Sequence, residues 1–151
     1  MNQPLLVLSA IFVALAALLH VYIFTLESVI WSQPTTWRIF GVRTQRDADI
    51  IKPMAFNQGF YNLFLAVEAG LGVILLAVSR PVAVTLVLVG AGSMVLAALV
   101  LLLSSKTTRR SALIQGVPPF VGLLFLLLSA LASRSPFAVR TSAGRVHHSR
   151  L

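Results

Sequence analysis

The sequence contains no cysteine, and only four of its 151 residues are acidic. Without a thiol, the chain cannot form disulfides, use a cysteine nucleophile or bind a metal through thiolates. Charged residues of both signs make up only 11% of the sequence, whereas soluble domains carry about 25%. A surface so poor in charge is suited to lipid, and we therefore expect an integral membrane protein.

Long apolar stretches are abundant, since 58% of the residues are hydrophobic. A membrane-spanning helix needs about 20 consecutive apolar residues and satisfies its own backbone hydrogen bonds in hydrocarbon. The stretches that meet this length are residues 4–31, 54–79, 82–103 and 112–132. They predict an all-α, polytopic membrane protein whose four transmembrane helices form an antiparallel bundle. The first stretch lacks the charged start and cleavage site of a signal peptide, so we expect it to be retained.

Two segments lie outside these stretches and differ from each other in composition. The loop at 32–53 mixes aromatic and basic side chains, which predicts a short amphipathic segment in the membrane interface. The last residues are basic and polar without apolar periodicity, which predicts disorder. We therefore divide the chain into a four-helix transmembrane domain, 1–133, and a basic tail without an assigned function, 134–151.

Basic residues outnumber acidic ones, and the formal net charge is +8. These residues are spread over loops and tail, which argues against a nucleic-acid partner and for contact with membrane lipids. The loops at 32–53 and 104–111 hold seven Lys and Arg residues, and the turn at 80–81 and the tail hold five. The positive-inside rule then favours both termini on the outside. The expected location is the cell inner (plasma) membrane, crossed several times.

The first apolar stretch carries polar residues that are costly in lipid. An acid at the centre of a membrane helix costs about 2.5–3.5 kcal/mol on insertion scales, which makes intramembrane acids functional candidates. His20, Phe24, Glu27 and Trp31 follow one another at intervals of 4, 3 and 4 residues. On a helix these four side chains form one stripe.

The second apolar stretch repeats the pattern with Asn57, Tyr61, Phe64 and Glu68. Because the two helices are antiparallel neighbours, we expect the two stripes to face each other. Depth along the helices then places the polar residues in the membrane leaflet next to the 32–53 loop. The sequence therefore predicts a polar pocket in one leaflet.

Roles follow from residue type. His20, Glu27 and Glu68 are the expected catalytic acid/base residues, since a carboxyl group away from water can hold a proton near neutral pH. The expected substrate-binding residues are Trp31, Asn57, Gln58, Tyr61, Asn62 and Gln115. No metal or cofactor is expected, because His20 and Glu27 lie about 10 Å apart along a helix, too far for one ion.

The alternative is that these side chains only tie helices together by hydrogen bonds, at about 0.6 kcal/mol each on average. The number of ionisable and amide groups in one leaflet favours a ligand site over packing alone.

Two motifs resemble a known family. LHVYIFTLESVIW at 19–31 and NQGFYNLFLA at 57–66, with Phe40-Gly41 between them, are similar to those of small bacterial four-helix membrane proteins classed as a domain of unknown function. The resemblance spans about residues 5–132. It implies four helices and supplies no substrate. The positions that match the family are His20, Glu27, Trp31, Pro34, Phe40, Gly41, Asn57, Gln58, Gly59, Tyr61 and Asn62.

Three functions stay open at this point. The favoured one is binding a lipophilic small molecule, or converting it by acid/base isomerisation or cyclisation, neither of which needs a cofactor. The second is a small proton-coupled carrier that uses Glu27, for which a homodimer is expected. The third is a non-catalytic membrane subunit that holds a partner helix.

Overall fold

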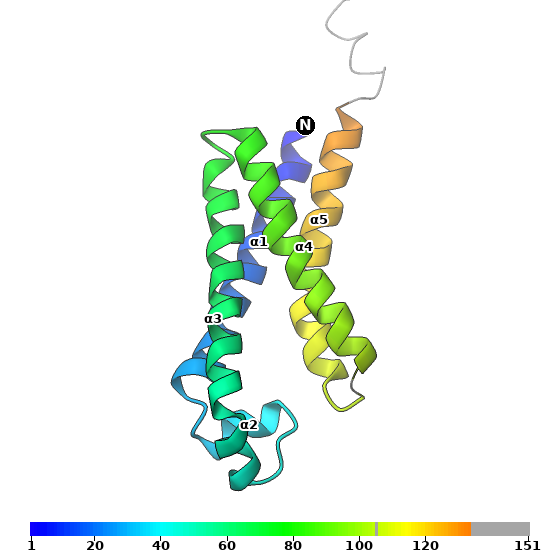
Figure 1. The fold of residues 1–151 in the computed structure, drawn as a ribbon. Helices are drawn as coiled ribbons and strands as arrows, with labels where there is room; N and C mark the ends of the chain where they lie inside the picture. The colour runs from blue at the N-terminus through cyan, green and yellow to red at the C-terminus, as the bar shows by residue number, and fades with distance from the viewer. Residues whose placement is uncertain (105, 134–151) are drawn as a thin grey trace, which may run out of the picture.

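The computed structural model describes residues 1–104 and 106–133, and within them it contains helices and no strands. The expected tail, 134–151, lies outside the described residues. The elements in chain order are α1 (Gln3–Phe24), the π-helix η1 (Thr25–Val29), α2 (Pro34–Ile39), α3 (Gln45–Leu75), α4 (Arg80–Ser104) and α5 (Arg109–Ala132) (Figure 1).

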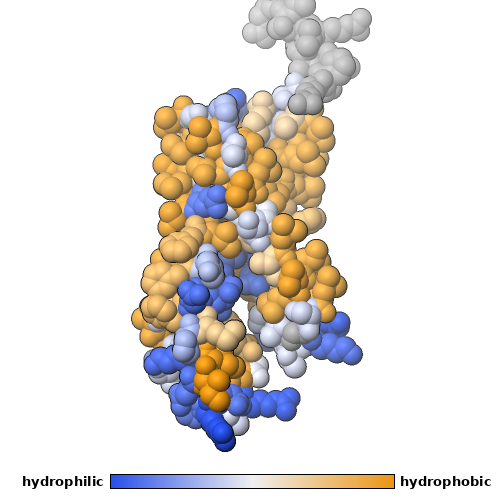
Figure 2. Space-filling model, viewed as in Figure 1, coloured by the Kyte–Doolittle hydropathy of each residue, from blue (hydrophilic) through white to orange (hydrophobic). Residues whose placement is uncertain are grey.

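Four of these segments are long and apolar enough to cross a membrane: Gln3–Val29, Gln45–Leu75, Arg80–Ser104 and Arg109–Ala132. This confirms the predicted all-α fold with four membrane-spanning helices, and it is the architecture of a multi-pass membrane protein. On the face shown in Figure 2, hydrophobic residues cover most of the helical surface, while hydrophilic residues gather around α2 and the connection between α4 and α5.

The helices form a ring in which α1 packs against α3 and α5, and α4 packs against the same two helices. The N-terminus and the end of α5 lie together at one end of the bundle, which we call the terminal end (Figure 1). The opposite end, which we call the loop end, carries α2 and the connection from α4 to α5.

Small residues allow the helices to approach closely in the half of the bundle nearer the terminal end. A Cβ atom added at Gly90 of α4 would lie 3.0 Å from the backbone nitrogen of Ala69 on α3. A Cβ atom at Gly122 of α5 would lie 2.8 Å from Cγ2 of Val13 on α1. Membrane helices have no hydrophobic drive to associate in lipid, so such close contacts supply much of their attraction.

The core of this half is closed by apolar side chains. Val13, Ala16, Met94 and Leu126 are buried in one cluster with several alanines. A second cluster at the loop end consists of Trp31, Trp37, Ala48 and Ala55. The residues between the two clusters include the polar ones singled out in the sequence.

The second of the four long helices, α3, begins nine residues before the predicted apolar stretch at 54–79. Thr44 caps it, since its hydroxyl oxygen accepts a hydrogen bond from the backbone nitrogen of Asp47 at 3.1 Å. The predicted 32–53 loop is therefore partly helix, with α2 followed by the first turns of α3. Apolar length could not locate this start because residues 45–53 are mostly polar, and Pro53 lies within the helix.

Candidate functional site

A π-helical turn places Glu27. The segment η1 continues α1 directly, and the Ile30 backbone nitrogen donates to the Thr25 carbonyl at 3.0 Å, five residues back. The helix therefore ends at Val29 and not at residue 31 as predicted. Glu27 lies in the middle of this turn and is only 8% exposed. Single π turns are frequent at functional sites, because the wider turn redirects the side chains that follow.

Glu27 is held by Asn62 of α3. The side-chain nitrogen of Asn62 donates to Oε2 of Glu27 at 2.8 Å and to the Gln58 carbonyl at 3.1 Å. Asn62 is 9% exposed, so the bond lies inside the bundle. The pair was predicted in one pocket on the basis of depth, and the structure brings the two side chains into direct contact.

A second contact joins the same two elements. The Ser28 hydroxyl donates to the Phe56 carbonyl at 2.8 Å, and Gly59 lies directly beneath Ser28 and Glu27. A side chain at Gly59 would collide with the Ser28 hydroxyl. Sequence reasoning missed Ser28 and Phe56, although the glycine between two amides in the NQGFYN motif is the signal that η1 approaches α3 here.

His20 is buried on α1, about two turns before Glu27, with 2% of its surface exposed. Its Nδ1 lies 2.9 Å from the Ala16 carbonyl oxygen. Because a carbonyl only accepts hydrogen bonds, Nδ1 carries the proton in this contact. In the neutral ring Nε2 is then the acceptor.

Three polar atoms of these residues have no hydrogen-bond partner among the described residues: Oε1 of Glu27, Oδ1 of Asn62 and Nε2 of His20. The fully enclosed side-chain atoms that lack a partner, within the described part of the chain, are Nε1 of Trp37 and Oγ1 of Thr108. The three site atoms are not among them, so none of the three is fully enclosed by the protein.

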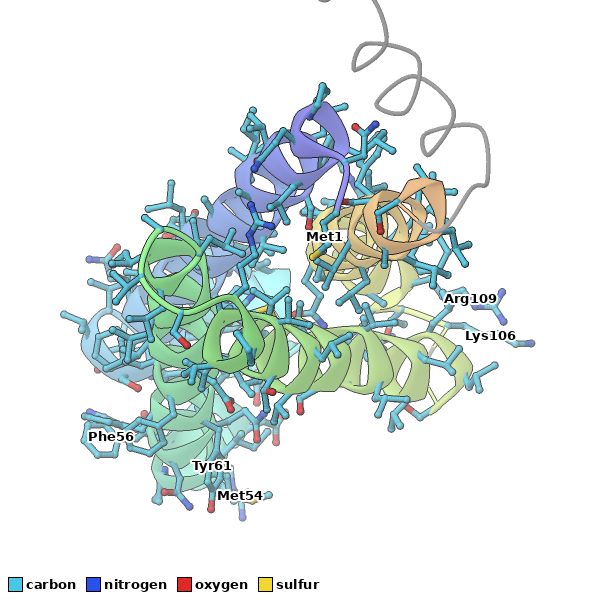
Figure 3. All side chains as sticks on the ribbon, turned by 90° about the horizontal axis from the view of Figure 1, so that it is seen from above. Met1, Met54, Phe56, Tyr61, Lys106 and Arg109 are labelled. Atoms are coloured by element: carbon cyan, nitrogen blue, oxygen red, sulfur yellow. The ribbon has the colours of Figure 1, made fainter. Side chains whose placement is uncertain are left out.

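The predicted pairing of the two polar stripes is wrong for most of α3. Tyr61 is 55% exposed and Phe64 is 60% exposed, and Asn57 is exposed as well. Figure 3 shows Met54, Phe56 and Tyr61 on the outer side of the helix. The inward face of α3 consists of small residues and one amide: Ala55, Gly59, Asn62, Ala66, Ala69 and Gly72. Close packing requires small side chains, and this rotates the bulky stripe outward.

The side chains of the remaining predicted site residues make no hydrogen bond to the Glu27 or Asn62 side chain within the described part of the chain. Gln58 is exposed, and Glu68 and Gln115 are half-buried. Among the described residues no hydrogen bond or ion pair joins any of these three side chains to Glu27 or His20. Trp31 is buried and donates from Nε1 to the Ala48 carbonyl at 2.9 Å, so it secures the start of α3 at the loop end.

Aromatic rings pack against one another between α1 and α3. Phe24 of α1 meets Phe60 of α3 edge to face, with ring centroids 5.2 Å apart. Phe60 also packs against Phe56 and Phe64, at 5.0 and 6.3 Å. Phe24 thus contributes to packing between α1 and α3 through its contact with Phe60.

Neither of two cavities among the described residues is lined by Glu27 or Asn62. One, of about 600 Å³, lies at the terminal end between α1 and the connection from α3 to α4. The other, of about 390 Å³, lies at the loop end beside Arg38 and Arg43. In the described part of the chain, no cluster of three or more His, Cys, Asp or Glu side chains has the arrangement of a metal site.

Comparison with known families identifies one match. The model of a family described as "Protein of unknown function (DUF1304)" matches residues 14–127, a range that includes His20, Glu27 and Asn62. Searches of curated proteins and of solved structures give no match. Because the matched range covers well over half of its length, the chain belongs to this family of unknown function.

Proposed function

We propose that the protein binds a lipophilic small molecule in the half of the bundle nearer the loop end, with the molecule's polar group at Glu27 and Asn62. The observation that carries this proposal is a buried intramembrane carboxyl group with one oxygen held by Asn62 and the other without a partner among the described residues. Oδ1 of Asn62, beside it, is equally available as an acceptor.

One bond from Asn62 leaves the second carboxyl oxygen of Glu27 without a partner among the described residues. An acid at the centre of a membrane helix costs about 2.5–3.5 kcal/mol, and Glu27, two residues before the end of the span Gln3–Val29, lies where that cost is smaller. A hydrogen bond between membrane helices contributes about 0.6 kcal/mol on average and at most about 1.7. A polar group of a bound molecule at Oε1 would supply a second interaction.

The arrangement of the helices supports entry from the side. α4 approaches α3 closely where Gly90 meets Ala69 and Gly72 meets Val87, all toward the terminal end. Nearer the loop end α4 diverges from α3 and packs on α5 instead, where Gly116 meets Ala98 (Figure 1). The surface is hollowed between these diverging helices, and hydrophilic residues are visible there (Figure 2). A lipophilic molecule could enter from the bilayer by this route.

The same arrangement supports binding over transport. A carrier needs access to Glu27 from both sides of the membrane, whereas Val13, Ala16, Met94 and Leu126 close the core toward the terminal end. Acid/base isomerisation or cyclisation of the ligand would require His20 and Glu27 to reach the same molecule. Glu68, the third expected acid/base residue, makes no hydrogen bond to either within the described part of the chain, so binding is the function that the geometry supports best.

Mass spectrometry of lipids extracted from the purified protein tests the proposal. The wild type should retain a lipophilic molecule other than the bulk bilayer lipids, at close to one per chain. Asn62→Ala and Glu27→Leu should lose it. Glu27→Gln removes the acid but keeps an oxygen that can accept the hydrogen bond from Asn62. This variant therefore distinguishes loss of the carboxyl group from loss of the fold.

Thr85→Ala is the control, because its hydroxyl bonds to the Pro81 carbonyl of its own helix, away from the site. This variant should retain the molecule. If the wild type carries only the bilayer lipids found on every variant, the binding proposal is wrong.

A further inference from the structure

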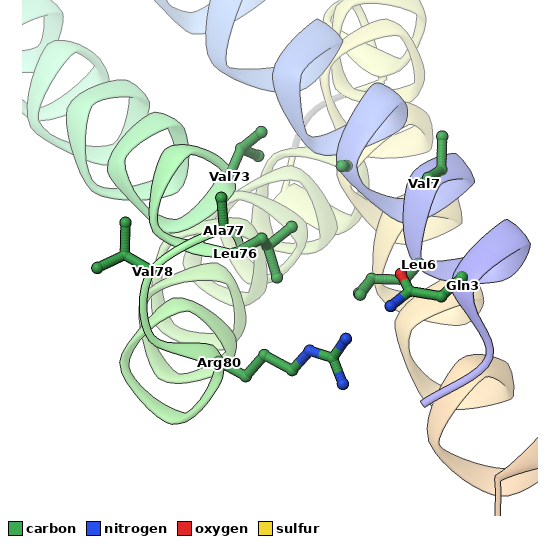
Figure 4. Close-up of a pocket in the computed structure, with 9 residues that line it drawn as sticks. Gln3, Leu6, Val7, Val73, Leu76, Ala77, Val78 and Arg80 are labelled. Atoms are coloured by element: carbon green, nitrogen blue, oxygen red, sulfur yellow. The ribbon is translucent and has the colours of Figure 1, made fainter.

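The cavity at the terminal end has apolar walls and one charged residue. Leu6 and Val7 of α1 form one wall, and Val73 and Leu76 near the end of α3 form the other. Arg80, the first residue of α4, stands beside them (Figure 4). We refer to this cavity as the Arg80 groove.

Arg80 carries the only charged side chain among the described residues of this end, 1–12, 70–92 and 120–133. The α-amino group of Met1 is a second positive charge at the same end. Arg80 is exposed, and the described residues offer it no ion pair or hydrogen bond. Figure 4 shows its side chain extended from α4 toward Gln3 and Leu6 on α1, across the groove. A cation therefore spans the opening of a groove whose other lining residues, apart from Gln3, are apolar.

Arg80 also lies at a defined depth. It begins the span Arg80–Ser104, so its guanidinium group lies at the level of lipid headgroups, while the groove walls extend into the hydrocarbon. A planar guanidinium group binds phosphate oxygens through two parallel hydrogen bonds. The walls beneath it match the chemistry of an acyl chain.

We propose that the Arg80 groove binds one anionic phospholipid, with the phosphate at Arg80 and one acyl chain between Leu6 and Val73. A free phosphate ion would leave the apolar walls unused. A second copy of the chain would bring another Arg80 toward the first, and the described residues of this end provide no acid between them. A phospholipid has a phosphate that can bind Arg80 and an acyl chain that can pack against the apolar walls.

This inference is independent of the ligand proposed at Glu27. The groove lies at the opposite end of the bundle, and none of its lining residues takes part in the Glu27–Asn62 contact. Loss of lipid from one site should leave the other occupied.

Native mass spectrometry of the full-length protein in detergent tests the proposal, with phosphatidylglycerol and phosphatidylcholine of identical acyl chains as probes. The first phosphatidylglycerol should bind about fivefold more tightly than phosphatidylcholine, the factor expected for one basic residue near an anionic headgroup. Arg80→Gln should abolish that preference. Arg109→Gln, which removes an exposed arginine at the start of α5, should leave it intact.

Filling the groove tests its apolar part separately. Ala10→Phe should weaken binding of both lipids severalfold while Arg80 is kept, and Ala77→Phe makes the same test from the opposite wall if the first variant does not fold. Equal binding of the two lipids, or no effect of Arg80→Gln, would overturn the proposal. So would competition by inorganic phosphate alone, or a dimer that is lost in Arg80→Gln.

Discussion

The side-chain nitrogen of Asn62 lies 2.8 Å from Oε2 of Glu27 and joins α3 to η1 inside the membrane-spanning bundle. The two residues are 35 positions apart in the sequence, and each lies within one of the two motifs that carry the family resemblance. The π turn thus places the acid Glu27 where the amide of Asn62 on the neighbouring helix can bind it.

A double-mutant cycle measures the strength of this contact. Glu27→Ala and Asn62→Ala should each destabilise the protein, and the coupling energy should be about 0.6–1.7 kcal/mol, the range for hydrogen bonds between membrane helices. The measurement is reversible unfolding in mixed micelles. A control cycle pairs Glu27→Ala with Asn57→Ala, which removes an exposed amide from the same helix. This control cycle should show no coupling energy.

Gly59 should tolerate no side chain. Gly59→Ala places a methyl group against the Ser28 hydroxyl and 3.1 Å from Cβ of Glu27, so η1 must move away from α3. We expect a loss of about 1–3 kcal/mol, typical of overpacking. Gly70→Ala is the matched control on the same helix, because its added Cβ meets nothing within 4 Å. Equal thermal stability of the two variants would contradict this packing.

The indole N–H groups of the two tryptophans should contribute differently to the stability of the protein. Nε1 of Trp31 donates to the Ala48 carbonyl at 2.9 Å, whereas Nε1 of Trp37 is buried without a partner among the described residues. Both substitutions to Phe remove similar ring volume. Trp31→Phe should therefore destabilise the protein by about 0.5–1.5 kcal/mol more than Trp37→Phe. Each variant retains a single tryptophan, so its fluorescence reports unfolding; the reverse order would contradict the bond.

The absence of cysteine allows a clean test of orientation. Val78→Cys places a thiol at the terminal end, in the exposed turn between α3 and α4, and Gln33→Cys places one at the loop end before α2. With the termini outside, a membrane-impermeant maleimide should label intact cells at residue 78 and should label residue 33 only after permeabilisation. The cysteine-free wild type is the blank. Labelling of residue 33 in intact cells would reverse the orientation.

Some of the site could be predicted from the sequence, and some could not. Glu27 and His20 were identified because an ionisable group in an apolar stretch is anomalous whatever surrounds it. Asn62 was expected as one of several substrate-binding residues, with Asn57 and Tyr61 on the same helix, and it is the member that faces Glu27. A helical wheel gives the angles between side chains of one helix, but it does not give the rotation of that helix toward its neighbour.

The sequence by itself determined four spans, their order and the presence of acids within two of them, because apolar length is a local property that each segment carries alone. The π turn at Glu27 and the inward face of α3 were decided by tertiary structure, whereas the start of α3 at Gln45 rests on a local cap by Thr44 that apolar length does not detect. The physical reason is the same for the first two. Helices in lipid gain stability from close approach, so the small residues Gly59, Ala66 and Ala69 face inward and turn Tyr61 and Phe64 out.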